Sequence, residues 1–346
     1  MEPAPPATGA TATASAGASR RAPLGLIALN LGGPGSLDDV RPFLQRLFAD
    51  PEVLQIHWRP LRSFIAWRIA RSRASFSRAA YAQIGGRSPI LQETTAQVEA
   101  VTEVLAGRGI ATVPVVAMAA WHPLADEALA ALAARGVSRA IALPLYPQES
   151  RTTTNSSLSQ IEAARARHPG LEVAAVRRYP DADGYLRAVV EKTEAAIATL
   201  PAELAPTAPV LFSAHGLPED YIRKGDPYLD DIRVTVEAVS RRMHLGARAR
   251  LCFQSRVGPK RWLGPATETA LDELAAAGTP AVVVVPIAFT GEHIETLQEI
   301  DILYRERATK AGITHFARAR TVGTHPAFIA ALADLAEAAA RGRGWL

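Results

Sequence analysis

From residue 24 onward the chain alternates short, continuous apolar runs with longer stretches of helical periodicity. The apolar runs, which we predict to be strands, are residues 24–31, 112–118, 139–145, 171–176, 210–214, 250–253, 281–288 and 314–319. Most of these runs are continuously apolar, as in parallel strands that helices cover on both faces. Helical stretches such as 37–49, 92–105, 124–134 and 293–309 lie between them. Strand–helix alternation of this kind predicts an α/β protein with doubly wound parallel sheets.

The length of 346 residues predicts two domains rather than one hydrophobic core. We place the first domain at residues 24–150 and the second at 151–324, each with a sheet of about four strands. Residues 325–346, with a helix at 326–340, are expected to complete the first domain. Residues 1–23 are rich in Ala, Pro, Thr, Gly and Ser and are predicted to be a disordered tail, because they bury too little apolar surface to offset their ordering entropy. A transit peptide is the alternative interpretation of this tail.

Composition narrows the functional classes. No apolar run reaches the roughly 18 residues that a membrane span needs. The net charge is only +4, so a pI of about 9.4 does not require a nucleic-acid partner, and we expect none. The single cysteine, Cys252, excludes an intramolecular disulfide and a metal or iron–sulfur site built from cysteines of one chain. A reducing cytoplasm is the expected location.

Positive charge is concentrated in residues 53–92, where seven arginines occur without an acidic residue. Aromatic side chains lie among the arginines: Trp58, Phe64, Trp67 and Phe76. Leu61, Ile65 and Ile69 recur with the spacing of one helical face. Two interpretations stay open. The segment is either a surface helix with an apolar underside and a solvated basic side, or a surface that docks peripherally on anionic membrane or an acidic ligand.

Unusual residues collect directly after the predicted strands, in segments 30–35, 145–148, 213–218, 253–259 and 289–295. Ligands of open α/β sheets bind outside the carboxyl ends of the strands, so these five loops predict one large cleft between two domains. The glycine loop at 30–35 matches no nucleotide-binding motif, and Pro34 lacks the backbone N–H that a phosphate would use. Glycine there suits close approach of the backbone to a large flat ligand.

One histidine and three glutamates are the candidate residues for chemistry. His215 follows a predicted strand, and Glu292, Glu295 and Glu299 share one face if a helix runs through 293–309. Stacked carboxylates repel one another unless a cation or a proton lies among them, and carboxylate with imidazole suits ferrous iron. A solvated acidic face is the alternative. His215, Glu295 and His293 together also have the composition of a non-haem iron facial triad.

Eight segments together resemble the ferrochelatase family, and the likeness runs from about residue 24 to residue 330. They are LNLGGPGSLDDVRPFLQRLFADPEV at 29–53, GGRSPI at 85–90, WHPL at 121–124, LYPQ at 145–148, SAHGLP at 213–218, KGDPY at 224–228, QSRVGPKRWLGP at 254–265 and VPIAFTGEHIETLQEID at 285–301. No one segment is specific, but the set is highly specific.

The resemblance implies two Rossmann-like domains with parallel sheets and a porphyrin cleft between them. It implies insertion of Fe²⁺, a substrate, into a porphyrin, expected to be protoporphyrin IX, to form haem. His215 and Glu295 match the family's active-site pair, for both catalysis and metal binding. The surrounding polar network or acidic path would comprise Glu292, His293 and Glu299. The residues expected to line the porphyrin cleft are Leu31, Ile90, Val257 and Trp262.

The chain departs from the family pattern in three ways. Ala119 and Ala120 stand where relatives usually carry Arg and Tyr, and Glu149 stands where they carry an aromatic residue. The cysteines that hold a [2Fe–2S] cluster in many relatives are missing, so we expect no such cluster and no permanently bound cofactor. Three alternatives stay open: a chelatase for another divalent metal, a non-catalytic porphyrin or haem carrier, and a nucleotide-dependent α/β enzyme.

Overall fold

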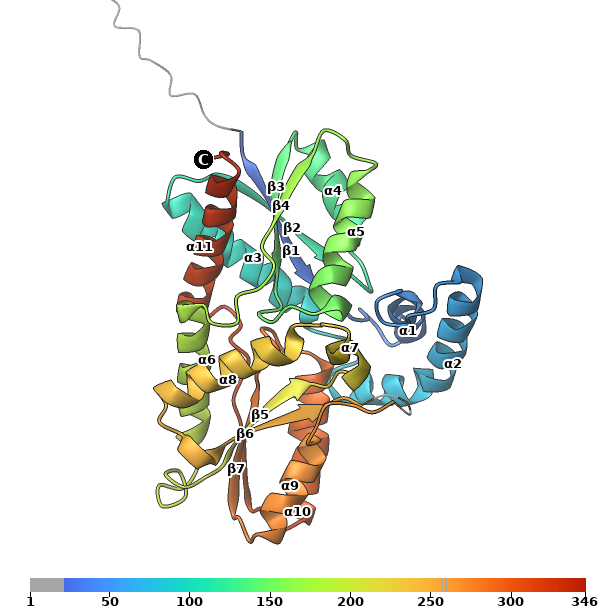
Figure 1. Ribbon diagram of the computed structural model, residues 1–346. Coiled ribbons are helices and arrows are strands. Elements are labelled where there is room, and N and C mark those ends of the chain that lie inside the picture. Colours follow the sequence, from blue (N-terminus) through green and yellow to red (C-terminus); the bar gives the residue numbers. More distant parts are fainter. Residues whose placement is uncertain (1–21, 257, 259) are drawn as a thin grey trace, which may run out of the picture.

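The computed structural model describes residues 22–256, 258 and 260–346. The tail predicted at 1–23 therefore lies outside the described residues, apart from Ala22 and Pro23, and so does Val257. The described chain forms two four-stranded parallel sheets, each with helices on both faces (Figure 1). The predicted α/β class is confirmed.

The first sheet has the order β2-β1-β3-β4 and is parallel throughout. Its strands are β1 (Leu24–Asn30), β2 (Thr112–Met118), β3 (Arg139–Pro144) and β4 (Glu172–Ala175). One face is covered by helices α3 (Ile90–Gly107) and α11 (Pro326–Gly342). The other face is covered by α4 (Ala125–Ala134) and α5 (Ser156–Arg165). The π-helical turn η1 (Arg151–Asn155) precedes α5. All of β1 is buried, as its unbroken apolar run predicts for a central strand.

The second sheet has the order β6-β5-β7-β8 and is also parallel. Its strands are β5 (Val210–His215), β6 (Ala249–Gln254), β7 (Ala281–Pro286) and β8 (His315–Arg318). Helices α6 (Asp183–Ile197) and α8 (Tyr228–Arg242) cover one face, and α9 (Thr267–Ala276) and α10 (Arg305–Lys310) cover the other. The connections also contain α7 (Glu219–Arg223), the 3₁₀ turn η2 (Gly246–Arg248) and the π-helix η3 (Glu295–Tyr304).

β4 pairs with β3 and so belongs to the first sheet, although we predicted residues 151–324 as the second domain. The chain changes sheet between β4 and β5, through α6. β4 is a short edge strand that buries little of its surface, so its composition does not mark which sheet it extends.

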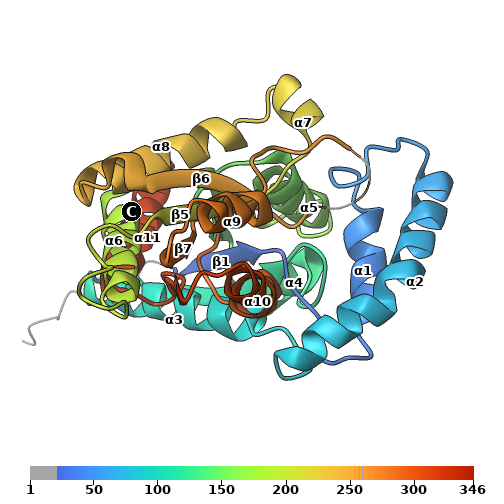
Figure 2. The same ribbon diagram turned by 90° about the horizontal axis from the view of Figure 1, so that it is seen from below.

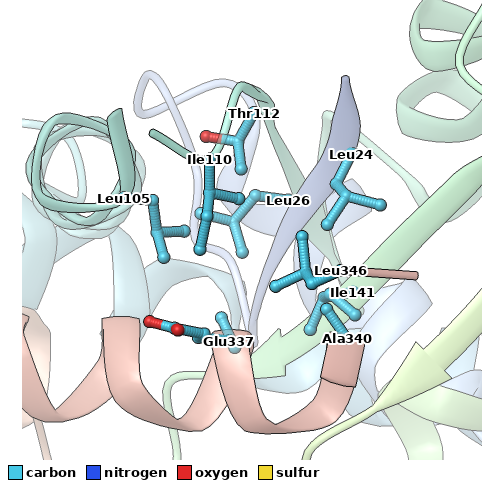
Figure 3. Close-up of a pocket in the computed structure, with 11 residues that line it drawn as sticks. Leu24, Leu26, Leu105, Ile110, Thr112, Ile141, Glu337, Ala340 and Leu346 are labelled. Carbon is cyan, nitrogen blue, oxygen red and sulfur yellow. The ribbon is translucent and has the colours of Figure 1, made fainter. Parts of the chain in front are cut away.

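The C-terminal helix α11 packs on α3 and β3 of the first sheet and on α6. A cavity of about 10 Å³ lies beneath it, lined mostly by apolar side chains of the sheet, α3 and the chain end (Figure 3). This volume is about that of a single water probe, so the helix closes the core nearly completely.

Helices α1 (Val40–Ala49) and α2 (Arg59–Gln83) pack against each other at one side of the two sheets (Figures 1 and 2). The buried residues of α2 are Ala66, Ala70, Ala80 and Tyr81. The apolar face predicted at Leu61, Ile65 and Ile69 is therefore not the buried one, and Leu61 is 41% exposed. Ala70 and Tyr81 belong to one buried cluster with Val40, Phe43 and Leu44 of α1. No helix of the described chain combines the length and the apolar character needed to cross a bilayer.

Candidate functional site

Three parallel strands of the second sheet bring polar residues to one edge. β5 ends at His215, β6 ends at Gln254, and the loop after β7 leads into η3 at Glu295. Because the strands are parallel, their carboxyl ends meet at the same edge. The backbone carbonyl of His215 accepts a hydrogen bond of 2.9 Å from the hydroxyl of Tyr228, which fixes the end of β5.

His215 and Glu295 are in direct contact, although 80 residues separate them in the sequence. Nδ1 of His215 lies 2.8 Å from Oε2 of Glu295. The His215 side chain is 37% exposed and that of Glu295 is 19% exposed, so a ligand outside the sheet edge can reach the imidazole while the carboxylate is mostly covered.

Each partner shifts the pKa of the other. Burial opposes the charged form of both groups, but their mutual attraction and hydrogen bond outweigh it. The pKa of His215 is therefore raised above 6.5. The pKa of Glu295 is lowered to about 2, with Ser255 adding a further hydrogen bond. The pair thus combines an ionised carboxylate with an imidazole whose affinity for a proton is raised.

Glu299 lies beside Glu295 on η3 and is contacted by four donor groups, one of which is the hydroxyl of Ser255. Oε1 accepts hydrogen bonds from the backbone N–H of Ser255 (2.9 Å) and the hydroxyl of Tyr304 (2.8 Å), and Oε2 accepts one from Nε2 of Gln254 (3.3 Å). Burial and the charge of Glu295 raise the pKa of Glu299. Glu295 and Glu299, two of the three carboxylates that were predicted to share a face, therefore lie together.

His293 lies two residues before the start of η3 and is buried. Burial lowers its pKa despite the nearby charges of Glu295 and Glu292, and its Nδ1 has no hydrogen-bond partner in the described chain. It does not complete a three-residue ligand set with His215 and Glu295. In fact, within the described residues no three His, Cys, Asp or Glu side chains are grouped to hold a metal ion by themselves.

Glu292 does not join the acidic face of Glu295 and Glu299, and that part of the prediction is wrong. Its two carboxylate oxygens accept hydrogen bonds of 3.0 and 3.1 Å from Nη1 of Arg318, whose side chain is only 7% exposed. Arg318 also bonds Asp301 of η3 at 2.7 Å. The reason is that η3 begins at Glu295, so Glu292 precedes the helix and points to β8 instead.

The residues expected to line a porphyrin cleft lie on both domains. Leu31 packs with the α1–α2 cluster, and Ile90 opens α3 beside the glycine loop, where a Cβ on Gly33 would lie 2.6 Å from Ser88. Trp262 lies beside the residue after His215, since a Cβ on Gly216 would lie 3.2 Å from its ring. The indole N–H of Trp262 is buried without a hydrogen-bond partner in the described chain. Val257 lies outside the described residues.

The residues that depart from the family pattern, Ala119, Ala120 and Glu149, lie in two separate parts of the structure. The backbone N–H groups of Ala119 and Ala120 donate to Asn30 and Leu31, so both alanines adjoin the glycine loop. Glu149 instead pairs with Arg177. This pair lines an open hollow of about 790 Å³ over η1 and α5, whose walls are mainly charged and polar. Such walls do not suit the apolar body of a porphyrin.

Sequence reasoning missed Ser255 and Tyr304 as members of the site. Ser255 lies in the QSRVGP segment, but the direction of its side chain depends on a backbone angle that the sequence does not reveal. Tyr304 is the last residue of η3, and only the π-helical winding brings it back to Glu299.

Comparison with known proteins assigns the chain to a family. Residues 23–340 match the Ferrochelatase family model. The chain belongs to the ferrochelatase family. A ferrochelatase from Synechococcus sp. (strain RCC307) is 42% identical over 324 residues, which cover 92% of this chain and 83% of that protein. A ferrochelatase from Nostoc sp. (strain PCC 7120 / SAG 25.82 / UTEX 2576) is 44% identical over 316 residues, covering 90% and 81%.

Solved structures share the fold. SirB from Bacillus subtilis with Fe³⁺ aligns with a TM-score of 0.56 and 15% identity over 93% of this chain and 98% of SirB. CbiX, described as the terminal enzyme of sirohaem biosynthesis in denitrifying bacteria, aligns with a TM-score of 0.50 and 16% identity over 91% and 99%. At such identities the likeness shows the architecture alone. The predicted family and the predicted enzyme class, a porphyrin metal chelatase, are confirmed by the family match and the relatives.

Proposed function

We propose that the protein inserts Fe²⁺ into a porphyrin, and that His215 and Glu295 bind the metal and remove the pyrrole protons. The observation that carries this proposal is the 2.8 Å contact between the two side chains at the edge of the second sheet. Imidazole and carboxylate together suit ferrous iron. The family assignment and the ferrochelatase names of the relatives support the reaction.

Metal insertion exchanges two pyrrole protons for one Fe²⁺, so the site must both supply a metal and take up protons. His215 can accept a proton because the charge of Glu295 raises its pKa. Glu295 stays ionised and attracts the cation. A flat free ring resists metal entry, so a cleft that binds the distorted ring more tightly than the flat one lowers the barrier. Leu31, Ile90, Val257 and Trp262 are the residues that we expect to provide such a cleft.

The test is the rate of Fe²⁺ insertion under anaerobic conditions, followed by visible absorption. His215→Ala and Glu295→Gln should each lose most of kcat while they stay folded and still bind porphyrin, as judged by thermal melting and porphyrin fluorescence. Glu191→Gln is the matched control, because it removes the carboxylate from another 2.8 Å His–Glu contact that lies on the surface. Near-normal kcat in either site variant would mean that the residue is structural.

The choice of metal and ring is a separate question. Imidazole and carboxylate do not discriminate sharply among divalent ions, because intrinsic affinities follow a general order. Competition between Fe²⁺ and Co²⁺ for the same porphyrin tests the choice of iron. Turnover itself separates a chelatase from a porphyrin or haem carrier, which would bind the product without forming it.

We infer that the protein works without a resident cofactor. Cys252 is the single cysteine of the chain and is buried in β6, and burial raises its pKa to about 12. A buried, protonated thiol is a poor iron ligand, since the thiolate is the ligating form. Stoichiometric iron and sulfide in anaerobically purified protein would contradict this inference.

The outward face of α2 is the proposed contact with anionic membrane, from which an apolar porphyrin would be delivered. Large apolar side chains are exposed there: Trp58 (67%), Phe64 (57%) and Phe76 (65%). Arginines surround them on a helix without acidic residues. Basic residues beside exposed aromatic rings suit the interface of an anionic bilayer.

Liposome sedimentation tests this contact. Arg68→Glu/Arg71→Glu should release the protein from anionic vesicles, and salt should weaken wild-type binding because the Debye length is about 10 Å at 0.1 M. Arg62 is left intact because it bonds the carbonyls of Ala49 and Ile56 and so holds α1 to α2. Arg135→Glu/Arg139→Glu, at exposed positions near α4, is the control with the same change in charge. Equal binding of both double variants to anionic vesicles would contradict the proposed membrane contact of α2.

A further inference from the structure

Ser255 has a backbone conformation that serine rarely adopts. Its φ is +65°, in the left-handed region that favours glycine, and His244 (φ +52°) is the one other non-glycine residue of the described chain with a positive φ. Such a conformation is unfavourable for a residue with a Cβ and is retained only where the surrounding contacts over-determine it. The contacts that hold Ser255 in this conformation therefore indicate the role of the residue.

Both polar groups of Ser255 point at the carboxylates of η3. The backbone N–H donates to Oε1 of Glu299 at 2.9 Å. The side-chain Oγ lies 2.9 Å from Oε2 of Glu295 and 2.5 Å from Oε2 of Glu299. The left-handed turn after β6 thus directs two hydrogen-bonding groups of one residue to two acidic side chains that would otherwise repel each other.

The hydroxyl of Ser255 contacts the same carboxylate oxygen of Glu295 that His215 contacts. Oε2 of Glu295 lies between Nδ1 of His215 (2.8 Å) and Oγ of Ser255 (2.9 Å), so its position is fixed from two sides. Hydrogen bonds to Oε1 of Glu295 are not formed within the part of the chain that the structure describes. The carboxylate is therefore oriented with one oxygen engaged and the other available to a substrate.

Gln254, the last residue of β6, supports the same arrangement. Its Nε2 donates to the backbone carbonyl of Glu295 at 3.2 Å, and its Oε1 accepts a hydrogen bond of 2.7 Å from the hydroxyl of Ser213 in β5. The end of β6 is thereby fixed to both β5 and η3. Ser255 starts from a rigid point, so its left-handed conformation sets the direction of its Oγ accurately.

We propose that Ser255 is a positioning residue for metal insertion, which orients Glu295 against His215 and holds Glu299 beside it. The hydroxyl has a single proton to share between Oε2 of Glu295 and Oε2 of Glu299, so it places the two carboxylates relative to each other, and the free Oε1 of Glu295 is the oxygen that meets Fe²⁺. This inference rests on the proposed function, because it assigns to Ser255 the orientation of a group that acts on the metal. Groups that orient metal-binding side chains typically change metal affinity or activity by about 10–100-fold when they are removed.

Ser255→Gly separates the role of the hydroxyl from that of the backbone. Glycine adopts a positive φ without strain and retains the N–H that bonds Glu299, but it lacks Oγ. If Ser255 served only the turn, glycine would replace it fully. If the hydroxyl orients Glu295, kcat for Fe²⁺ insertion should fall about 10–100-fold, while the KM for porphyrin stays unchanged and the Tm is equal to or above that of the wild type.

His244→Gly is the matched control, because it relieves the other positive φ at an exposed position that makes no contact with the site residues discussed above. It should match Ser255→Gly in Tm and the wild type in kcat. Ser255→Gly with kcat within about twofold of the wild type would overturn the inference. A fall in both Tm and kcat would also overturn it, since Ser255 would then serve the fold. A wild-type protein that inserts no Fe²⁺ would instead refute the proposed function itself.

Discussion

Arg318 is the cation that allows a buried acidic residue to precede η3. Its guanidinium reaches Glu292 at 3.0 Å and Asp301 at 2.7 Å, and its side chain is 7% exposed. Burial alone would raise the pKa of Glu292, but the charge of Arg318 and its hydrogen bonds lower that pKa instead. The arginine thus ties β8 to both ends of the segment that carries His293 and Glu295.

Arg318→Met should reduce the free energy of unfolding by about 3–5 kcal/mol, because it leaves a buried carboxylate without its cation. Urea unfolding at pH 7 measures the change. Arg307→Met is the matched control: Arg307 makes two hydrogen bonds to Asp272, but both side chains are about half exposed, so its loss should change stability by less than about 1 kcal/mol. Equal losses in the two variants would show that burial does not set the strength of the Arg318 pair.

The ion pair between Glu292 and Arg318 also predicts that the stability of the protein depends on pH. The folded-state pKa of Glu292 lies below its ordinary value of 4.5, so its contribution to stability is complete above that pH and is lost as the pH falls through the folded pKa. Glu292→Gln should therefore flatten the acid side of the plot of stability against pH. An unchanged acid limb would contradict a lowered pKa at Glu292.

At the scale of elements, α6 and α11 approach closely at Gly184. A Cβ at this position would lie 2.1 Å from the carbonyl oxygen of Ala327, which is far inside van der Waals contact. Gly184→Ala should therefore separate the two helices and lower the free energy of unfolding by about 1–3 kcal/mol or more. Gly107→Ala, at the exposed end of α3 with open space around it, should instead stabilise slightly, because alanine is the better helix former. Unfolding in urea distinguishes the two, and equal effects would contradict the close approach.

The elements themselves were predictable where one physical cause dominates. All eight strands were predicted, the central ones most clearly, because burial on both faces leaves a continuous apolar run such as that of β1 or β7. The arrangement of the acidic residues, by contrast, could not be predicted from the sequence. The spacing of Glu292, Glu295 and Glu299 assumes an α-helix through all three, whereas the helix begins at Glu295 and is a π-helix with i→i+5 hydrogen bonds. Local composition does not reveal that winding, because tertiary contacts of Gln254, Ser255 and Arg318 support it.

The buried face of α2 was mispredicted for a related reason. Leu61 and its neighbours have the hydrophobicity of a core face, but Ala66 and Ala70 are the buried residues, and Ala70 packs with residues of α1. Periodicity identifies an apolar side, and only the partner helix decides which side is buried. The His215–Glu295 pair was foreseeable because parallel strands bring their carboxyl ends to one edge, whereas Ser255 depends on a positive φ.

At the scale of the whole molecule, the two sheets are joined by buried hydrogen bonds. Nε2 of Gln97, on α3 of the first domain, donates to the backbone carbonyls of Thr290 (2.8 Å) and Gly323 (3.0 Å). The hydroxyl of Thr290 donates in turn to the carbonyl of Leu145 at the end of β3. Thr290 lies in the loop that leads to His293 and Glu295, so the first domain helps to place the candidate site of the second.

Gln97→Met should destabilise the protein and slow metal insertion together. Methionine fills nearly the same volume but cannot donate, so the carbonyl of Gly323 loses its side-chain partner at about 1–3 kcal/mol. The carbonyl of Thr290 keeps the backbone N–H of Gly323 as a donor at 2.8 Å. The loop before η3 also loses its tie to α3, so we expect kcat for Fe²⁺ insertion to fall even at temperatures where the variant is fully folded. Gln92→Met, at an exposed position on the same helix, is the control and should match the wild type in both measurements. Urea unfolding and anaerobic insertion kinetics are the two measurements. A Gln97→Met variant with lowered stability but normal kcat would show that the hydrogen bonds between the two domains stabilise the fold without placing Glu295.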